Sequence, residues 1–486
     1  MNNRITKYSV IIMAVLLLAA GCNAKQKPAN ISSEGVLSPG YWKSQALTDI
    51  IPFWEGTIDE ENGGFYTDVE PDGSVWGPGN KFPRMNSRAV FGFTAAYMLS
   101  GDEKYLELAA HGMEYLSEYG WDHENGGWHT YTDEENEPDS YGKNLFDETY
   151  GNLGPVYYFF ATGDSKALSL VSRTHSLLRE KAWDKENGGY YAKMTKDWSI
   201  STTNKSFNSQ IDTCTAYLIY YYLATRDAKL LSDLTELADA VVSHMVDPKT
   251  GFVGEYFDRK WKWLEEDLWA GHNLKTGWVL MRVYFLTGDK KYLQAAQKIA
   301  KAQMKYTWDN KYGGWLFRFM KDDPSSVSTE KDWWTQEEGN MLMLNMYKHN
   351  PDKEYIDKLE KCSNFWDAHF IDKKHGECWS TLTRSGAASR KVKADYFKSA
   401  YHTMEQALFS CLYLSLYVHK KDAELYFRLS AEKQGKKHYV VPVESPDVII
   451  KSVEIDGKKW DKFNPQKGFI TLPAGKNMKI KVTYSI

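Results

Sequence analysis

Two histidines, His272 and His402, and one arginine, Arg88, are the residues of this sequence best suited to chemistry. An imidazole titrates near neutral pH, so a pair of imidazoles can remove and return a proton with little adjustment of their pKa. The planar guanidinium of arginine can hold an oxyanion or a pair of hydroxyls through parallel hydrogen bonds. These three groups suit proton transfer, provided that the fold brings them into one cavity.

The same residues share a position in a repeat. Turns of helical hairpins are marked by an aspartate at steps of 62, 63, 62 and 63 residues: Asp102, Asp164, Asp227, Asp289 and Asp352. Counting back 14 to 17 residues from each aspartate gives polar residues near the start of the preceding helix: Arg88, Asp147, Asp212, His272, Gln336 and Glu338. His402 opens the next such helix. Helix N-termini offer free N–H groups and a positive dipole end, which favour developing negative charge.

A second marker, Asp-x-x-x-Gly, keeps the same phase. It recurs at steps of 63, 62, 63, 62 and 63 residues, at Asp59/Gly63, Asp122/Gly126, Asp184/Gly188, Asp247/Gly251, Asp309/Gly313 and Asp372/Gly376. A period near 62 residues accommodates two helices and their turns, and it indicates repeated supersecondary units. Each unit is predicted to contain helix A, a tight turn, helix B, the Asp-x-x-x-Gly turn and a short aromatic loop.

The predicted helices are six of type A and five of type B. Helices A are expected at 86–99, 144–161, 206–224, 272–286, 333–348 and 402–418, and helices B at 103–118, 165–181, 227–244, 290–305 and 352–368. The segment 41–55 precedes the first Asp-x-x-x-Gly turn and supplies the missing helix B. Six hairpins completed in this way predict a closed (α/α)6 barrel, because an open array would need polar caps at both ends and none is evident.

The two ends of the chain differ from the repeat. Arg4 and Lys7 precede the apolar run 10–20 and the sequence LAAGC, which predicts a lipoprotein signal peptide over 1–21 with lipidation of Cys22. Residues 22–39 are polar and predict a tether, and 40–434 form the predicted barrel. After about residue 435 apolar and polar residues alternate, so 435–486 is expected to be a small β-rich appendage. The protein is thus expected to be exported, membrane-anchored and periplasm-facing.

The composition of the chain limits the kinds of molecule that it is expected to bind. The net charge is only -4 and no basic run occurs, which argues against nucleic acid. Cys214, Cys362, Cys378 and Cys411 lack metal-ligand spacing and are interpreted as core thiols, although an exported protein could also form a disulfide. Aromatic residues make up 15% of the chain, which suits surfaces that stack on sugars as well as packed helix interfaces.

Four motifs resemble those of a known superfamily. SRAVFGFTAAY, GHNLKTGWVL, WWTQEEGN and YHTMEQAL, in this order over about residues 40–418, are similar to the N-acylglucosamine 2-epimerases and cellobiose 2-epimerases. The resemblance implies a sugar 2-epimerase or aldose–ketose isomerase that needs no metal or other cofactor. It places proton transfer at sugar C2 on His272 and His402, with Arg88 supporting the oxygens of a cis-enediolate. A small carbohydrate is the expected substrate and a monomer or homodimer the expected assembly.

The resemblance also assigns substrate contacts. Those that match the family pattern are Asn208, Trp333, Trp334, Gln336 and Glu338, and the polar residues Asp147, Asp212 and Lys275 are further candidates. Where the family commonly reads Asn-x-His-x-His, the chain has Asn208, Gln210 and Asp212, and Lys275 replaces an acidic residue. Phe397 replaces a tryptophan, whereas Lys398 is kept. Because Lys275 lies three residues after His272 on a helix, we expect its charge to lower the pKa of that histidine.

Two other functions fit the sequence less well. A glycoside hydrolase or lyase on the same barrel would use carboxylates such as Asp147, Asp212 and Glu338, held about 5–9.5 Å apart across the scissile bond. A membrane-tethered protein that binds carbohydrate without turning it over would keep the barrel and lose the proton transfer.

Overall fold

The computed structural model describes residues 34–77 and 79–486. The predicted signal peptide, Cys22 and most of the predicted tether lie outside these residues. The last residues assigned to the tether are packed instead: Gly35–Leu37 forms a helical turn, Val36 and Leu37 are buried, and Trp42 Nε1 donates to Val36 O over 2.8 Å. Within the described ranges no helix combines the length and apolarity needed to cross a bilayer.

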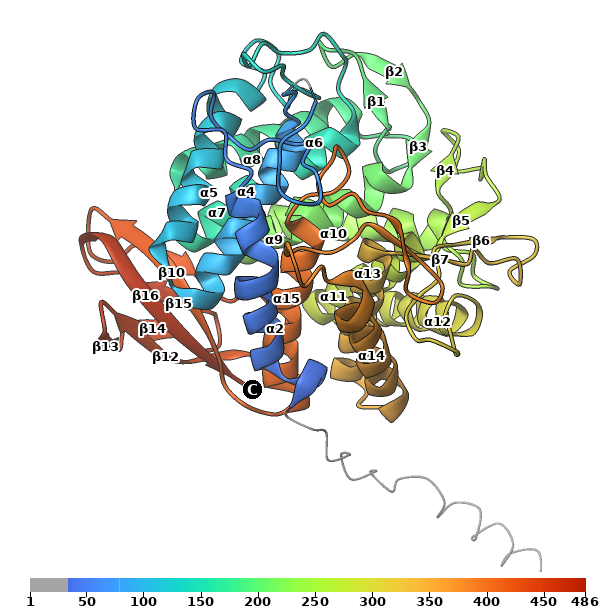
Figure 1. The fold of residues 1–486 in the computed structure, drawn as a ribbon. Coiled ribbons are helices and arrows are strands. Elements are labelled where there is room, and N and C mark those ends of the chain that lie inside the picture. The colour runs from blue at the N-terminus through green and yellow to red at the C-terminus, as the bar shows by residue number, and fades with distance from the viewer. Residues whose placement is uncertain (1–33, 78) are drawn as a thin grey trace, which may run out of the picture. The chain divides into compact units, whose positions relative to one another are not determined.

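Six inner helical segments form a closed ring, and Figure 1 labels the α-helices among them. In chain order they are α4 (Pro83–Ser100), α6 and α7 (Leu145–Gly151 and Leu153–Thr162), η5 and α9 (Asn208–Leu218 and Ile219–Thr225), α11 (Ala270–Thr287), α13 (Trp333–His349), and α15 with η8 (Tyr401–Tyr413 and Leu414–Val418). Each packs on the next, and α15 packs on α4, so the ring closes. The predicted (α/α)6 barrel is confirmed.

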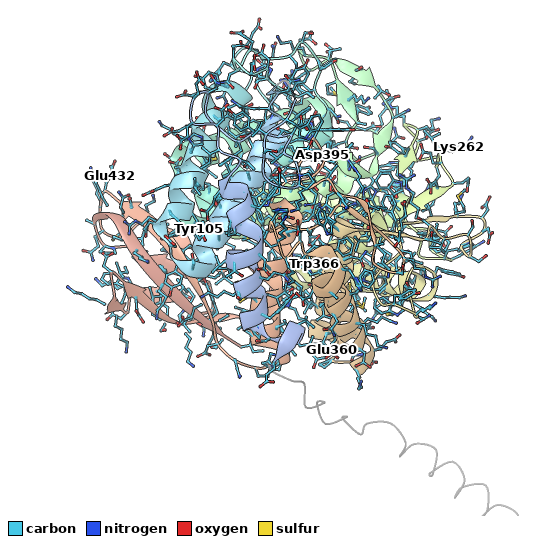
Figure 2. All side chains as sticks on the ribbon, in the orientation of Figure 1. Tyr105, Lys262, Glu360, Trp366, Asp395 and Glu432 are labelled. Atoms are coloured by element: carbon cyan, nitrogen blue, oxygen red, sulfur yellow. The ribbon has the colours of Figure 1, made fainter. Side chains whose placement is uncertain are left out.

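Six outer segments surround this ring. They are α2, η2 and α3 (Pro39–Gln45, Ala46–Ile50 and Ile51–Glu55), α5 with η3 (Glu103–Tyr115 and Leu116–Gly120), α8 with η4 (Ser165–Leu177 and Leu178–Ala182), α10 with η6 (Ala228–Ala240 and Val241–Met245), α12 (Lys290–Tyr306), and α14 with η7 (Lys353–Phe365 and Trp366–Phe370). The N-terminal segment packs on α15, as predicted for the missing helix B. Trp366, labelled in Figure 2, joins it to η7 by donating from Nε1 to Gln45 Oε1 over 3.0 Å.

The first repeat marker is a helix cap. The side chain of each marker aspartate accepts a backbone N–H in the first turn of the following helix, as Asp102 does from Lys104 and Asp289 from Lys291. In three repeats the residue before the marker aspartate is a glycine that ends the preceding helix in the left-handed conformation. Gly101, with φ 69°, is an example. Arg226 takes the same conformation with φ 56°.

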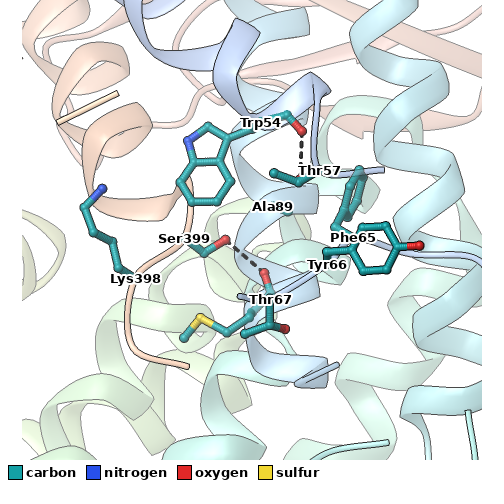
Figure 3. Close-up of a pocket in the computed structure, with 9 residues that line it drawn as sticks. Trp54, Thr57, Phe65, Tyr66, Thr67, Ala89, Lys398 and Ser399 are labelled. Atoms are coloured by element: carbon teal, nitrogen blue, oxygen red, sulfur yellow. Dashed lines mark hydrogen bonds between the residues drawn. The ribbon is translucent and has the colours of Figure 1, made fainter. Parts of the chain in front are cut away.

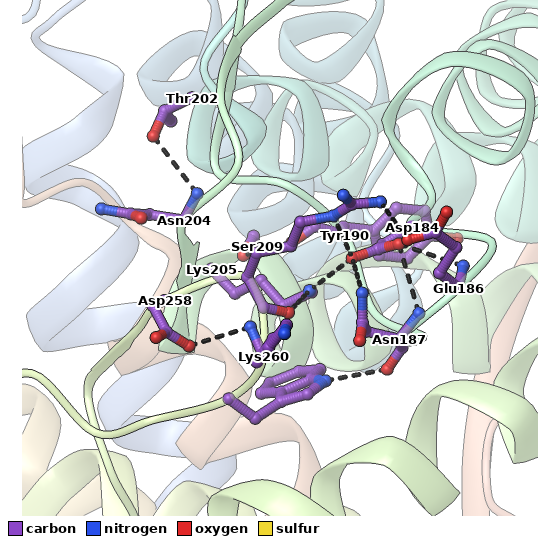
Figure 4. A network of polar contacts seen from close by, with 12 residues as sticks. Asp184, Glu186, Asn187, Tyr190, Thr202, Asn204, Lys205, Ser209, Asp258 and Lys260 are labelled. Atoms are coloured by element: carbon purple, nitrogen blue, oxygen red, sulfur yellow. Dashed lines mark hydrogen bonds and ion pairs between the residues drawn. The ribbon is translucent and has the colours of Figure 1, made fainter.

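The second repeat marker is held by a buried lysine. In five of the six turns among the described residues, the aspartate pairs with a lysine that lies 21 or 22 residues later: Asp59–Lys81, Asp122–Lys143, Asp184–Lys205, Asp309–Lys331 and Asp372–Lys393. Figure 4 shows the third case, where Lys205 Nζ lies 2.8 Å from Asp184 Oδ2. These ion pairs fix the loops that lead into the inner helices.

Short strands shape the loops at the N-terminal end of the inner helices. They are β1 (Lys193–Met194), β2 (Ile200–Thr202), β3 (Lys205–Ser206), β4 (Tyr256–Phe257), β5 (Asp267–Trp269), β6 (Arg318–Met320), β7 (Glu330–Asp332), β8 (Thr381–Thr383) and β9 (Ala388–Arg390). They pair antiparallel as β1–β2, β3–β4, β5–β6 and β7–β8–β9. Strands β5 and β7 run directly into α11 and α13 and so set where those helices begin.

The appendage starts earlier than predicted. Strand β10 (Ala423–Ala431) begins shortly after η8 ends, so the boundary at residue 434 is wrong, because β10 belongs to the appendage sheet. One antiparallel sheet has the order β10, β16 (Gly475–Ser485), β12 (Ile449–Ile455) and β13 (Lys458–Trp460). The other has the order β11 (Lys437–Tyr439), β15 (Phe469–Thr471) and β14 (Phe463–Asn464). Strand β10 packs on α4 and α7.

Candidate active site

The two histidines lie at the same end of the barrel. His272 is in the first turn of α11 and His402 in the first turn of α15. Both rings lie against the indole of Trp334, with centroid distances of 5.1 Å for His272 and 6.3 Å for His402. Two histidines from distant parts of the chain therefore face one site, as the repeat phase predicted.

His272 is held by a carboxylate and by aromatic rings. Its Nδ1 lies 2.6 Å from Glu255 Oε2, and the other oxygen of that carboxylate accepts the backbone N–H of Trp269 over 3.0 Å. The imidazole is sandwiched between Phe207, with centroids 3.8 Å apart, and Trp269, with centroids 5.0 Å apart. This packing fixes the ring plane and leaves Nε2 as the nitrogen available for chemistry.

His402 is held in the same way from another helix. Its Nδ1 lies 3.0 Å from Glu337 Oε2 and 3.7 Å from Glu338 Oε1. Burial, followed by the positive charges of Lys275 and Arg88, holds the pKa of His402 well below its usual value, and His272 adds to this effect. His402 is therefore neutral at physiological pH, and among the described residues its Nε2 has no hydrogen-bond partner.

Arg88 reaches the site from α4. Its guanidinium lies over the Tyr150 ring at 3.9 Å, and Nη1 donates to Phe397 O over 2.7 Å. Among the described residues this is the only hydrogen bond of the Arg88 side chain, and its Nε is buried without a partner. Arg88 thus keeps donors available for an oxygen in the site.

Lys275 forms the centre of a buried polar network. Its ammonium lies 3.1 Å from Asp212 Oδ1, 3.2 Å from Glu338 Oε1 and 3.0 Å from Tyr150 Oη. Asp212 also accepts from Asn208 Nδ2 over 2.7 Å. The side chain points to these groups rather than to His272, and its positive charge helps to lower the pKa of His402. The expected effect of Lys275 on His272 stays a prediction.

Three buried carboxyls lie behind His402. Burial raises the pKa of Glu337 well above its usual value, helped by Glu338 and Glu405, and burial raises the pKa of Glu338 to about 7 despite Lys275. The pKa of Glu405 is also raised by burial. Glu337, Glu338 and His402 have ligand atoms within 4.8 Å of one another, a spacing that a metal ion could use. The Lys275 ammonium already supplies a positive charge at Glu338.

The kept residue Lys398 supports the site without entering it. It is fully buried and lies 2.8 Å from Glu377 Oε1, while Trp54 Nε1 donates to Glu377 Oε2 over 2.7 Å. Figure 3 shows Lys398 and Ser399 around a small cavity of about 10 Å³, roughly the size of one water. In the same loop, Asp395 (Figure 2) accepts the backbone N–H of Lys398 over 2.8 Å. These contacts fix the loop that leads into His402.

Comparison with known proteins identifies a family for this chain. Residues 64–406 match the N-acylglucosamine 2-epimerase (GlcNAc 2-epimerase) family. The chain belongs to the N-acylglucosamine 2-epimerase family. This membership makes it an enzyme, a carbohydrate isomerase.

Individual relatives of this family are similar over most of their length. The chain is 25% identical to a cellobiose 2-epimerase of Bacteroides fragilis over 74% of its own residues and 95% of the relative. It is 24% identical to a D-mannose isomerase of Marinomonas mediterranea over 72% of its own residues and 92% of the relative. The solved cellobiose 2-epimerase of Bacillus thermoamylovorans has the same fold, with a TM-score of 0.72 and 22% identity. The match covers 77% of this chain and 98% of the solved chain.

Two of the residues assigned to substrate contact have other uses in this family member. Both ends of the buried Gln336 amide bind the backbone of Trp315, over 2.7 and 2.8 Å, so Gln336 is reassigned to loop support. Asn86, Gln210 and Asn273 bind the corresponding loops in the same way. Asp147 is buried and lies 2.6 Å from Arg84 Nη1, at the edge of the site.

The tryptophans differ in their relation to the histidines. The Trp334 ring contacts both His272 and His402, whereas of the two histidines the Trp333 ring contacts His402, edge-on at 6.3 Å. Gly271 makes the position of Trp334 possible, because an added Cβ would collide with the indole.

Sequence reasoning missed the carboxylates that hold the histidines. Glu255 lies in the loop before β4, four residues after Gly251, and the other five repeats have no carboxylate at this position, so no periodic signal marks it. Glu337 stands beside the predicted Gln336 and Glu338, and a helical position three residues from Trp334 could have suggested it.

Proposed function

We propose that the protein epimerises a reducing sugar at C2, or isomerises it between aldose and ketose, without a cofactor. The observation that carries this proposal is the shared position of His272 and His402 against Trp334, each with Nδ1 fixed by a carboxylate. The aromatic wall around His272 suits the apolar face of a pyranose. The relatives named for cellobiose and D-mannose support a neutral mono- or disaccharide as substrate.

The reaction would begin on the open-chain aldose. One histidine Nε2 takes the C2 proton, the C2 electron pair forms the C1–C2 double bond, and the carbonyl electrons move to O1. Arg88 would stabilise the resulting cis-enediolate, whose charge lies on oxygen. Return of a proton to the opposite face of C2 gives the epimer, and return of a proton to C1 with transfer of the O2 proton to O1 gives the ketose.

The carboxylates suggest different starting roles for the two histidines. One Glu255 oxygen accepts the backbone N–H of Trp269, and the other would accept from His272 Nδ1. With its proton on Nδ1, His272 has an unprotonated Nε2 that can act as the base. Glu337 has a raised pKa and can donate its own proton to His402 Nδ1. His402 would then carry its own proton on Nε2 and act as the acid, and as Nε2 gives this proton to carbon the Glu337 proton would move to Nδ1, so that the imidazole stays neutral.

Solvent deuterium exchange tests the proposal. Unlabelled glucose, mannose, cellobiose and related reducing sugars would be incubated with enzyme in D2O, and label at C2 and C1 followed by NMR. We expect deuterium at C2 of the epimer or at C1 of the ketose. A new reducing end without label would indicate hydrolysis, and neither change in any sugar would indicate a binding protein.

Replacement of each histidine provides the matched test. His272→Asn and His402→Asn should each lower kcat by about 10²-fold or more, since each removes a general acid or base, while the melting temperature and sugar binding persist. Turnover close to the wild-type rate in both variants would remove these residues from the mechanism.

The carboxylates do not favour hydrolysis. Asp147 is tied to Arg84, and both Asp212 and Glu338 are tied to Lys275. A family 76 glycoside hydrolase from Bacteroides thetaiotaomicron is similar in fold alone, with a TM-score of 0.58 at 15% identity.

We also infer export and lipid anchoring in the periplasm through Cys22, from the signal sequence. Labelling of the wild-type protein with radioactive palmitate, lost in Cys22→Ser, would support the anchor. A Cys22→Ser protein that still fractionates with membranes and carries label would refute it.

A further inference from the structure

A cavity of about 370 Å³ lies where the appendage meets the barrel. It is lined by Tyr222 and Arg226 at the end of α9, by Phe285 and Leu286 at the end of α11, and by residues 439–448 and 466–468 of the appendage. His272 begins α11 and Phe285 stands near its end, so this cavity is about 20 Å from the candidate active site along the helix axis. The volume falls within the range of ligand pockets, roughly 300–1,000 Å³.

Arg226 is the residue of this cavity with unused binding capacity. Its guanidinium lies between the rings of Tyr222 and Tyr439, at 5.5 and 5.8 Å from their centroids. Among the described residues its side chain makes neither an ion pair nor a hydrogen bond, and its Nε is buried without a partner. A half-buried guanidinium fixed by two aromatic faces is prepared for a planar anion.

The other charges of the cavity favour an anion as well. Glu444 is fully buried, and its carboxylate lies 2.7 Å from Arg282 Nε and accepts from Tyr413 Oη over 3.1 Å, so its charge is compensated. Lys467 is exposed on the cavity wall. From Ala423 to Ile486 the chain carries 12 Lys and Arg but 7 Asp and Glu, although the whole chain has a net charge of -4.

We propose that this junction cavity is a second binding site, separate from the active site, for a sugar acid. The carboxylate would pair with the fork of Arg226, and the tyrosine rings and Phe285 would cover the apolar face of the sugar ring. The positive appendage would attract such a ligand. The site does not depend on the proposed proton transfer, so either proposal can fail without the other.

Calorimetry with three probes tests the site: D-glucuronate, D-glucose and inorganic sulfate. Glucuronate should bind the wild-type protein saturably and bind Arg226→Asn about tenfold or more weakly, the loss expected for one charge-assisted pair. Asparagine tolerates a positive φ, so this variant should fold. Arg428→Asn is the matched control, because it removes one appendage charge that pairs with Glu103 outside the cavity.

Each outcome decides the proposal. Glucuronate binding that Arg226→Asn weakens and Arg428→Asn leaves unchanged, with glucose and sulfate at least tenfold weaker and turnover retained, would support it. Tyr439→Ala should then weaken glucuronate binding too. Equal affinity for sulfate would reduce the site to an anion site and overturn the sugar acid. No glucuronate binding, or equal weakening in the two arginine variants, would overturn the site itself.

Discussion

Replacement of Glu255 by glutamine should disable His272 by reversing its hydrogen bond. In the structure one Glu255 oxygen accepts the backbone N–H of Trp269 over 3.0 Å and the other lies 2.6 Å from His272 Nδ1. A glutamine must keep its oxygen toward Trp269 to satisfy that N–H, which turns its NH2 toward His272 Nδ1. Nδ1 then becomes the acceptor, the proton moves to Nε2, and the base is blocked.

The size of the effect follows from the bond that is lost. A hydrogen bond to a charged group contributes about 1.5–3 kcal/mol, which corresponds to a decrease in kcat of about 10- to 150-fold. The wrong tautomer can add to this loss. KM should change little, because Glu255 does not contact the sugar in the proposed mechanism.

Steady-state kinetics and C2 exchange rates would measure this, with the melting temperature as a check on folding. Glu266→Gln is the matched control, since Glu266 lies just before β5 and, among the described residues, its carboxylate pairs with Lys321 alone. A Glu255→Gln enzyme with kcat within threefold of wild type, or one slowed no more than Glu266→Gln, would refute the reasoning.

Other substitutions test the buried charges. Lys275→Met removes a positive charge that lowers the pKa of His402, so that pKa should rise, and for the epimer on which His402 is the base the acidic limb of the kcat/KM profile should move to higher pH. Lys275→Arg keeps the charge and should leave the limb in place, and an unmoved limb in Lys275→Met would contradict the coupling. Lys143→Met leaves Asp122 buried without its partner at 2.9 Å and should cost about 3–5 kcal/mol of unfolding free energy in denaturant titrations, against less than about 1 kcal/mol for Lys196→Met at an exposed pair. Although burial opposes this shift, hydrogen bonds from Asn125 and Lys143 hold the pKa of Asp122 at about 2. The contribution of Asp122 to the unfolding free energy is therefore present above pH 3.8 and lost as the pH falls toward 2. Lys143→Met should flatten this loss, and an unfolding free energy that falls equally with acid in the variant and the wild type would contradict the reasoning.

The sequence determined the helical ring because the same helix caps and glycine turns recur about every 62 residues, and each of them depends on neighbouring residues only. Each Asp102-type residue caps the helix that follows it, and each Asp-x-x-x-Gly turn needs glycine at a positive φ, as at Gly126. These requirements are met within a few residues, so they can be read from the chain. The phase of the repeat then placed Arg88, His272 and His402 at one end of the barrel.

Only the tertiary structure decided what those residues touch. Glu255 comes from a loop and Glu337 from a neighbouring helix, and the orientation of each carboxylate depends on backbone groups that the sequence does not locate. Gln336 has the right phase for the site, yet its amide binds a loop, because a side chain at a helix start can point inward or toward the loop before it. Contacts between segments far apart in the chain, such as Lys275 with Asp212, depend on how the helices pack and therefore emerge only once the ring has closed.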